Sequence, residues 1–498
     1  MCWSGGRDHT LDGPARAQRL AFWVVTQIHD LTVLEIAAAI RRRELSPVEV
    51  TGHYLDRIEA LNADVGAFFT VTADAARDQA AEAEKAVVRA SDPGSLPPLT
   101  GVPIPIKDLN MVAGVRQTLG SLAFADNVPA EDDHVTAALR AAGAVLPGKT
   151  ATPEFGLPCY TETAIGPPAR TPWDLSRSAG GSSGGAGAAV AAGLAPAAQG
   201  SDGGGSIRIP ASVCGLFGIK PTRGRISKAP LEPDLAGLST GGPLTRTVAD
   251  AALLLDVMVG NRDGDMYTQP PLPPGETFLG YASRDPGRLR IGRTKTHAVA
   301  DGMVHPDCAT AYEDASALLA SLGHEVVDID PPFGPDVVPP FETLWCVLAT
   351  LVPLDAAQEE VLLPLTSYLR QRGRALSAAD LIFAQAFLQI IVRGSWQLLN
   401  EYDVVLTPTL AQPPAPVGYF EEVDPPENFE RQKRFTPFTA VYNVTGQPAV
   451  NLPLYWTAAG LPIGVMLAGK MCDEATLLSL SAQVEAARPW KDRHPPLW

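Results

Sequence analysis

The sequence predicts an α/β fold. Amphipathic segments of helix length alternate along the chain with short, almost wholly apolar runs of strand length, as expected for helices packed on a buried sheet. The composition, 46% hydrophobic and 19% charged, is that of an ordinary globular enzyme. We find no internal repeat in the 498 residues, and the Pro- and Gly-rich stretch 262–300 is the best candidate for a linker.

Capping sequences mark the first two helices. Thr32-Val33-Leu34-Glu35 and Ser46-Pro47-Val48-Glu49 both fit the capping box, and the second has proline at the first helical position. The elements expected to follow are an alanine-rich helix over 73–90, a buried strand in VPIPIKD that ends at Lys107 and Asp108, a helix over 133–142 and a strand over 144–146.

The second half of the chain begins with a surface crossing over 262–290, which is rich in Pro and Gly. Residues 305–400 have mostly helical periodicity. The remaining expected elements are a buried strand over 402–410, a strand pair over 447–454 and 461–469, and a closing helix over about 473–487.

Residues 1–30 are expected to be a disordered leader. The apolar run 20–25 is shorter than the roughly 7–15 residues of a signal peptide's core, and no stretch reaches the roughly 20 apolar residues of a membrane span. We therefore expect a cytoplasmic protein with no membrane partner. A further hypothesis is that natural translation starts at Val24 or Val25, which N-terminal sequencing that finds Met1 would reject.

Charge and cysteine usage exclude other classes of protein. With 55 acidic and 39 basic residues the net charge is −16, whereas a nucleic-acid partner would need a basic surface. The six cysteines form no C-x-x-C pair, and the eight histidines show no H-E-x-x-H spacing. We expect no disulfide framework, no metal, no cofactor and no nucleic-acid partner.

Two glycine-walled serine clusters lie about one helix apart between Gly180 and Pro210. This density of glycine indicates a backbone in conformations that other residues cannot adopt. A serine hydroxyl needs a nearby base to become a good nucleophile, and the sequence lacks a G-x-S-x-G elbow with a downstream histidine. Lys107 is the alternative base, because burial at a strand end would lower its pKa.

Together, Lys107 in PIKD, Ser182 in GGSSGG and Ser206 in SDGGGSIRIP resemble the amidase signature family. Their separations of 75 and 24 residues recur in that family, and GKTATPEFG, GIKPTRGRIS, GPLTRTVADAALLLD and NVTGQPAVNLPL extend the resemblance over about 31–489. The chain looks most similar to stand-alone amidases such as the 6-aminohexanoate cyclic dimer hydrolases and the aryl acylamidases. The resemblance implies a central twisted mixed β-sheet surrounded by α-helices, in a single domain over 31–498 with a more variable helical insertion at about 300–400.

The resemblance also implies roles for individual residues. Ser206 is the expected nucleophile, Ser182 (after a cis bond to Gly181) the proton relay, and Lys107 the general base. The backbone N–H groups of the oxyanion hole are expected from Gly203, Gly204, Gly205 and Ser206. The residues expected to hold this loop by hydrogen bonds are Ser183, Asp202 and Arg208.

Two departures from the family pattern concern the fit of the substrate. The usual D-T-G-G-S is D-G-G-G-S here, with Gly203 in place of threonine, and Thr171 in ARTPWD stands where asparagine is usual. We expect an amidase that acts on a small-molecule amide. A homodimer is the assembly considered, and the sequence does not decide it.

Three alternatives to an amidase remain open. The first is an A-type subunit of glutamyl-tRNA amidotransferase, although such subunits usually have glutamine where this chain has Ile209. The second is an esterase or urethanase that uses the same site, and the third is an inactive binding protein. A covalent serine probe whose labelling is lost in Ser206→Ala separates the enzymes from the binding protein.

Segments around the core are expected to contact the substrate. The candidates are Cys159 and Tyr160 after the TPEF loop, and Phe438, Tyr442 and Asn443 late in the chain. Trp345 and Phe387, in the helical insertion, could cap the site. These large apolar side chains favour an apolar or aromatic acyl group.

Overall fold

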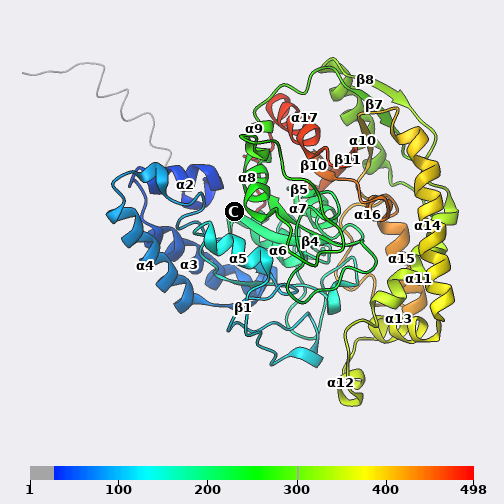
Figure 1. The fold of residues 1–498 in the computed structure, drawn as a ribbon, viewed down its shortest axis with the longest axis horizontal. Helices are drawn as coiled ribbons and strands as arrows, with labels where there is room; N and C mark the ends of the chain where they lie inside the picture. Colours follow the sequence, from blue (N-terminus) through cyan, green and yellow to red (C-terminus); the bar gives the residue numbers. More distant parts are fainter. Residues whose placement is uncertain (1–26, 300–301) are drawn as a thin grey trace, which may run out of the picture.

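A mixed sheet of eight strands crosses the middle of the molecule (Figure 1). The computed structural model describes residues 27–299 and 302–498. In order across the sheet the strands are β4 (Ala197–Asp202), β6 (Thr240–Thr245), β5 (Phe217–Lys220), β10 (Ala449–Trp456), β11 (Pro462–Gly469), β9 (Val404–Pro408), β7 (Arg290–Arg293) and β8 (Glu325–Asp328). Neighbours are antiparallel from β4 to β9, whereas β9, β7 and β8 are parallel. The predicted α/β fold with a mixed central sheet is confirmed.

A small second sheet carries Lys107. In this sheet β2 (Ile106–Lys107) pairs in parallel with β3 (Gly148–Thr150), and β1 (Phe68–Val71) pairs antiparallel with the other edge of β3. The backbone N–H of Lys107 donates to Gln199 Oε1 of β4 at 2.9 Å, which joins the two sheets. The strand predicted in VPIPIKD is therefore present and ends, as expected, at the lysine.

Helices surround the sheets. Those of the first half are α2 (Val33–Arg41), α3 (Pro47–Val65), α4 (Ala73–Arg89), α5 (His134–Ala141), α6 (Gly184–Ala191), α7 (Arg208–Cys214) and α8 (Val248–Met258). Those of the second half are α9 (Phe278–Tyr281), α10 (Pro306–Ser321), α11 (Val338–Leu348), α12 (Ala356–Glu360), α13 (Pro364–Ala375), α14 (Ala378–Leu399), α15 (Pro425–Phe435), α16 (Val441–Thr445) and α17 (Glu474–Ala487). Figure 1 shows α2, α3 and α4 on one side of the molecule and α11, α13 and α14 on the other.

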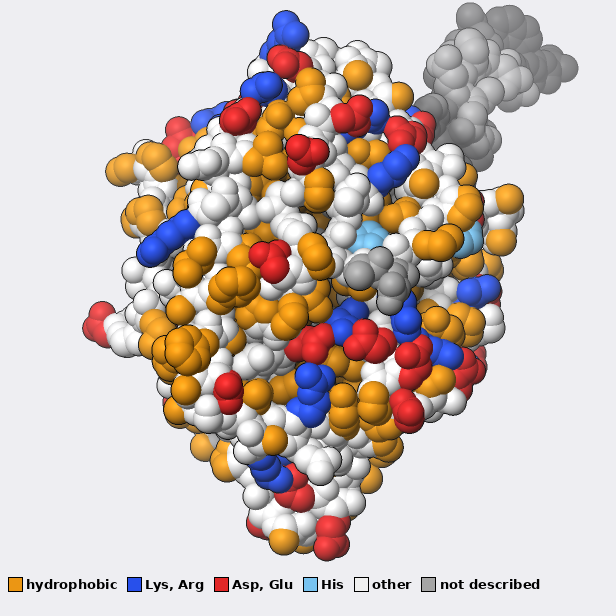
Figure 2. All heavy atoms as spheres, turned by 90° about the vertical axis from the view of Figure 1, so that its right-hand side faces the viewer, with side chains coloured by type: hydrophobic (Ala, Val, Ile, Leu, Met, Phe, Trp, Pro, Cys, Tyr) orange, Lys and Arg blue, Asp and Glu red, His pale blue; other side chains and the backbone are white. Residues whose placement is uncertain are grey.

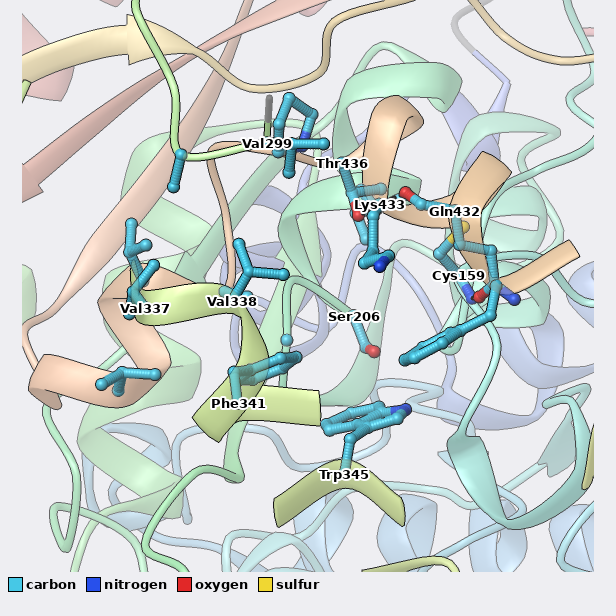
Figure 3. A pocket seen from close by; sticks show the side chains of 18 of the residues that line it. Cys159, Ser206, Val299, Val337, Val338, Phe341, Trp345, Gln432, Lys433 and Thr436 are labelled. Carbon is cyan, nitrogen blue, oxygen red and sulfur yellow. Dashed lines mark hydrogen bonds between the residues drawn. The ribbon is translucent and has the colours of Figure 1, made fainter. Parts of the chain in front are cut away.

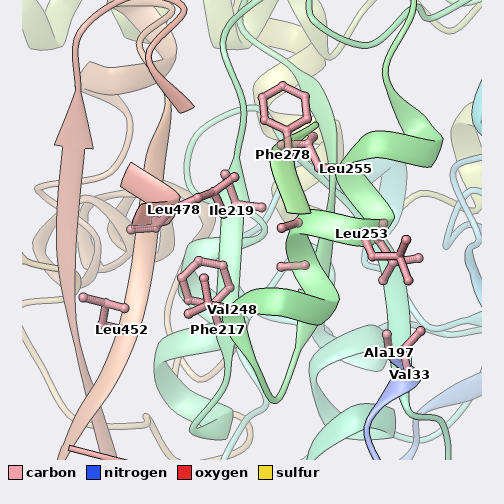
Figure 4. Packing of buried hydrophobic residues seen from close by; sticks show 14 of the residues in the cluster. Val33, Ala197, Phe217, Ile219, Val248, Leu253, Leu255, Phe278, Leu452 and Leu478 are labelled. Carbon is pink, nitrogen blue, oxygen red and sulfur yellow. The ribbon is translucent and has the colours of Figure 1, made fainter. Parts of the chain in front are cut away.

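The largest apolar core lies between the main sheet and helices α8 and α17 (Figure 4). Phe217 and Ile219 of β5 and Leu452 of β10 face Val248 of α8 and Leu478 of α17 across this core, and all five side chains are buried. Burial of apolar side chains on this scale supplies most of the free energy of folding, so this core fixes the sheet edge on which the functional residues stand.

Some predicted elements differ in detail. The capping box at Thr32 is confirmed, whereas Ser46 caps α3 without a reciprocal bond from its backbone N–H to Glu49. The Ser46 hydroxyl donates to Glu84. The strand predicted over 144–146 is wrong: Val145 forms only an isolated bridge, and β3 begins at Gly148. The N–H of Leu146 donates to the Gln79 side chain, so it is withdrawn from the ladder.

The predicted leader reaches less far than expected. Residues 1–26, including the hypothetical start at Val24 or Val25, lie outside the described residues. Residues 27–30 were assigned to the leader, but the 3₁₀ turn η1 (Ile28–Asp30) packs on the domain, and His29 is buried. The indole N–H of Trp498 donates to Asp30 Oδ1 at 2.7 Å, so contact with the end of the chain explains this difference.

The predicted insertion at about 300–400 divides into two parts. Helix α10 packs on strands of the main sheet, to which β8 belongs, whereas α11 packs on both α13 and α14, and α13 packs on α15. Helix α14 has the length and composition of a membrane span, a test that core helices of globular proteins also pass. Its Leu388 is buried, but Phe387 is exposed and caps no site. Figure 2 looks onto this side of the molecule, where hydrophobic side chains lie among charged ones.

Candidate active site

A buried lysine forms the inner end of the site. The side chain of Lys107 has no exposed surface, and the equally buried Ile104 and Ile106 hold its strand in the interior. The Lys107 Nζ donates to Ser182 Oγ at 2.8 Å and to Ser201 Oγ at 3.0 Å. Its partners are therefore uncharged oxygens, in contrast to the buried Lys149, which forms an ion pair of 3.0 Å with Asp108.

Burial changes the acid–base behaviour of Lys107. Loss of solvation lowers the pKa of its ammonium group to about 7, although the negative charges of Asp202 and Glu232 oppose this shift. A large fraction of the amine is consequently uncharged near neutral pH. An uncharged amine that accepts a hydrogen bond from a serine hydroxyl can take its proton.

Ser182 lies between this lysine and the larger of two cavities at the site. The peptide bond between Gly181 and Ser182 is cis, as expected. A Cβ at Gly181 would lie 2.7 Å from the backbone of Tyr160, so only glycine fits there. Ser182 borders a cavity, whereas Lys107 borders neither of the two cavities described below. A proton that passes between Lys107 and a bound molecule must therefore pass through one of its two hydroxyl partners, Ser182 or Ser201, which both border the larger cavity.

Ser206 comes from the second serine cluster, two residues before α7. The backbone N–H of Ser183 donates to the Ser206 carbonyl oxygen at 3.2 Å, which brings the two clusters together. Among the described residues, no hydrogen bond joins the hydroxyls of Ser206 and Ser182, but both side chains border the same cavity. Catalytic hydrogen bonds are often long in unliganded enzymes and shorten when substrate binds.

A buried ion pair holds the loop that carries Ser206. Asp202 Oδ1 lies 2.8 Å from Arg208 Nη2, and neither side chain is exposed. Burial alone would raise the pKa of Asp202, but the charge and hydrogen bonds of Arg208 hold it well below its usual range. The Asp202 carboxylate also accepts the backbone N–H groups of Gly205 at 2.8 Å and Ile207 at 3.2 Å. Both ends of the loop are thus fixed to one carboxylate.

Ser183 fixes the end of β4 in a similar way. Its hydroxyl donates to the Ser201 carbonyl oxygen at 3.1 Å and accepts the Ser201 N–H at 3.2 Å. The three residues expected to hold the loop therefore all make hydrogen bonds to it or to the strand that leads into it.

One of the expected oxyanion-hole donors is engaged elsewhere. The N–H of Gly205 donates to Asp202, which corrects the prediction for this residue. Its φ of +133° and the 2.4 Å between a hypothetical Cβ and Thr439 Oγ1 explain why the position is glycine. Within the described chain, the N–H groups of Gly203, Gly204 and Ser206 donate no hydrogen bond and remain available to an oxyanion.

Two cavities meet at Ser206. The smaller measures about 100 Å³, and Figure 3 shows Ser206 pointing into it between Phe341 and Trp345 of α11 and Gln432 and Lys433 of α15. The larger measures about 450 Å³. Its lining includes Ser182, Ser201, Gly203, Ser239, Leu348 and the charged Lys228, Glu232 and Asp234. Of the described residues, three border both cavities and lie between them: Leu157, Ser206 and Trp345.

Of the predicted substrate contacts, Cys159 borders the smaller cavity and Tyr160 borders neither. The ring of Tyr160 stacks on Phe420 at 4.7 Å, and its hydroxyl accepts from Asn428 Nδ2 at 2.9 Å. Because both its face and its hydroxyl have partners in the protein, the Tyr160 side chain turns away from Ser206. The prediction for Tyr160 is therefore wrong.

The three late candidates also lie outside both cavities, which corrects their prediction as substrate contacts. Phe438 packs edge-on against His297, and Tyr442 packs edge-on against Phe333. Asn443 is buried behind the loop, where its Nδ2 donates to Asp202 Oδ1 at 2.9 Å and its Oδ1 accepts from Arg208 at 2.7 Å. Asn443 therefore supports the ion pair rather than the substrate.

Two residues of the site were not predicted as such. No sequence motif marks Ser201. The two-residue period of β4 nevertheless places it on the same face as Gln199, which binds the strand of Lys107. Thr439 Oγ1 donates to the Gly204 carbonyl at 2.6 Å and so orients the peptide that ends in Gly205. Thr439 lies more than 200 residues from that glycine in the sequence, and no local sequence pattern predicts the contact.

Comparison with known proteins now decides the family. The model of the Amidase family matches residues 49–478. This chain belongs to the amidase signature family. The putative amidase AmiB2 of Mycobacterium tuberculosis (strain ATCC 25618 / H37Rv) is 42% identical over 451 residues, which cover 89% of this chain and 93% of the relative. An acylamidase of Rhodococcus erythropolis is 35% identical over 488 residues, which cover 94% and 98%.

Solved structures agree with this assignment. The structure of 6-aminohexanoate cyclic dimer hydrolase superposes with a TM-score of 0.86 at 32% identity and covers 94% of this chain and 99% of that one. A bacterial aryl acylamidase superposes with a TM-score of 0.83 at 25% identity, with coverage of 93% and 97%. The protein is therefore an amidase, a hydrolase of amide C–N bonds.

The two departures of this amidase from the family pattern have structural consequences. Thr171 Oγ1 donates to the Val213 carbonyl at 2.8 Å, near the end of α7, so this side chain serves the fold. Gly203 has no side chain, and the indole of Trp345 lies over it: a Cβ at Gly203 would be 3.7 Å from Trp345 Cη2.

Proposed function

We propose that this amidase hydrolyses a small-molecule amide through an acyl-enzyme on Ser206, with Ser182 as proton relay and Lys107 as general base. The observation that carries the proposal is the 2.8 Å hydrogen bond from the buried Lys107 to Ser182, a residue that borders the same cavity as Ser206. The pKa of about 7 for Lys107 supports it, because a base works best near the ambient pH.

Acylation then proceeds by a balanced transfer of protons. Lys107 takes the proton of Ser182 as Ser182 takes the proton of Ser206, and the Ser206 oxygen attacks the carbonyl carbon. The N–H groups of Gly203, Gly204 and Ser206 stabilise the negative charge that forms on the carbonyl oxygen. The C–N bond breaks as the Lys107 ammonium returns its proton through Ser182 to the leaving nitrogen. Water then repeats the sequence and releases the acid.

The position of Ser182 assigns the two halves of the substrate. The leaving nitrogen must receive its proton from Ser182, which borders only the larger cavity, so the amine part lies there. The acyl part lies in the smaller cavity, where Phe341 and Trp345 favour a hydrocarbon group. The relatives named as an acylamidase and as a 6-aminohexanoate cyclic dimer hydrolase support an amide substrate of this kind.

Steady-state kinetics with an acyl p-nitroanilide test the proposal. We expect Ser206→Ala to lower kcat/KM by at least about 10⁴-fold and Lys107→Ala by about 10²–10⁴-fold. Ser283→Ala is the control, since Ser283 is exposed and borders neither cavity, and it should change kcat/KM by no more than about twofold. A Ser206→Ala enzyme that keeps a tenth of the parent activity would overturn the proposal.

A further inference from the structure

Trp345 occupies a special position between the two cavities. With Ser206 and Leu157 it is one of three described residues that border both. Its ring stacks on Phe341 with 5.4 Å between centroids and 22° between planes. A Cβ built on Gly204 would lie 3.5 Å from Trp345 Cη2, so the indole faces this part of the loop and leaves room there for little more than a methyl group.

We propose that Trp345 is a specificity-determining residue that limits the size of the acyl group. The inference rests on the proposed function, because it requires the acyl group to be attached to Ser206 in the smaller cavity. That cavity, at about 100 Å³, is smaller than the apolar cavity of about 150 Å³ that is known to hold benzene. A compact acyl group fits beside the indole, whereas a larger one meets the indole where the two cavities adjoin.

Gly203 completes this arrangement from the other side. A Cβ at Gly203 would lie 3.5 Å from the Ser239 Cβ and 3.7 Å from Trp345, both ordinary contact distances. A single methyl group therefore fits at ordinary contact distances, and a larger side chain brings further atoms near the indole and Ser239. The missing side chain at Gly203 thus leaves space for the Trp345 indole, which lies between the two cavities.

The experiment measures kcat/KM for p-nitroanilides whose acyl group grows from acetyl to butanoyl, benzoyl and 2-naphthoyl while the leaving amine stays constant. We expect Trp345→Ala to raise the naphthoyl-to-acetyl ratio of kcat/KM at least about tenfold, the lower end of what one pocket contact contributes to selectivity. Trp345→Phe should shift the ratio in the same direction by less. Val347→Ala is the matched control: Val347 lies on the same helix and borders neither cavity, so the ratio should not change.

A second pair of variants guards against a general loss of structure. Gly203→Val should lower kcat/KM for benzoyl anilide, and adding Trp345→Ala should restore part of it, because the valine then has the space of the indole. An unchanged acyl ratio in both Trp345 variants, or the same shift in Val347→Ala, would overturn the inference while leaving the acyl-enzyme in place. If the Ser206→Ala variant hydrolysed every anilide as fast as the parent enzyme, the proposed function would be overturned, and this inference with it.

Discussion

Lys107 is the residue on whose buried amine the proposed proton transfer depends. A lysine without exposed surface pays a large desolvation cost as an ammonium ion, and here no carboxylate lies within hydrogen-bond distance to offset it. Lys149, equally buried, forms an ion pair with Asp108 and has an ordinary structural role. The same residue type in two neighbouring strands therefore serves different purposes, and the partner determines which.

The pH dependence of the reaction follows from this residue. Since burial lowers the pKa of Lys107 to about 7 and only the uncharged amine accepts a proton, kcat/KM should rise about tenfold per pH unit below 7 and level off above about 8. Initial rates between pH 5 and pH 9 measure this profile. The residual activity of Lys107→Ala should lack the inflection. A parent profile that stays flat across the range would contradict a role for Lys107 as base.

At this scale the sequence was most informative where chemistry is encoded in short motifs. Lys107, Ser182 and Ser206 each stand in a local pattern, and the structure brings the lysine and the first serine into contact. Asn443 was misassigned because its partners, Asp202 and Arg208, lie far away in the sequence. An amide side chain in a late loop reads equally well as a ligand contact or as support for an ion pair, and only the fold distinguishes the two.

At the scale of elements, the short helix α7 and the end of β4 hold the nucleophile between them. Arg208, the first residue of α7, reaches back to Asp202, the last residue of β4, and the three glycines 203–205 lie between these two anchors. Breaking a buried ion pair by removing one partner is costly, because the other charge remains buried without compensation. The loop is therefore rigid through its anchors, and not through its glycines.

Removal of the Asp202 charge tests this view. We expect Asp202→Asn to lower the free energy of unfolding by about 3–5 kcal/mol, since Arg208 loses its counter-ion, and to reduce kcat/KM as well. Calorimetry or urea unfolding measures the first effect. Asp174→Asn, which breaks an exposed pair with Arg177, is the control and should cost no more than about 1 kcal/mol. Equal losses in the two variants would contradict an anchoring role.

Elements with a clear period or cap were predicted close to their observed bounds, whereas a strand defined by its pairing was not. The run around Val145 is apolar and short enough for a strand, but Pro105 and Pro147 have no N–H to extend the ladder, and Gln79 takes the N–H of Leu146. Side-chain competition of this kind is not visible in a hydrophobic pattern. The strand of this region therefore lies four residues later than predicted, as β3 over Gly148–Thr150.

At the scale of the whole molecule, the site is assembled from segments that are distant in the sequence. The small sheet supplies Lys107, the two glycine-rich clusters supply the serines, and α11 and α15 supply walls of the smaller cavity. Trp345 of α11 borders the same cavity as Gly204 and Ser206, more than 130 positions earlier in the chain. The sequence could therefore indicate that Trp345 caps the site, but it could not place Trp345 between two cavities and it misplaced the late residues. The helical insertion thus completes the active site as well as covering it.

The central claim is that the reaction passes through an acyl group on Ser206, and mass spectrometry of the intact protein tests it most directly. The enzyme is mixed with an aryl carbamate, whose carbamoyl-serine hydrolyses slowly, and is quenched in acid during turnover. We predict a mass increase equal to one carbamoyl group, located by proteolysis on the peptide that contains Ser206 and absent from Ser206→Ala. An adduct that persists in Ser206→Ala, or that maps to another residue of the parent enzyme, would contradict the account.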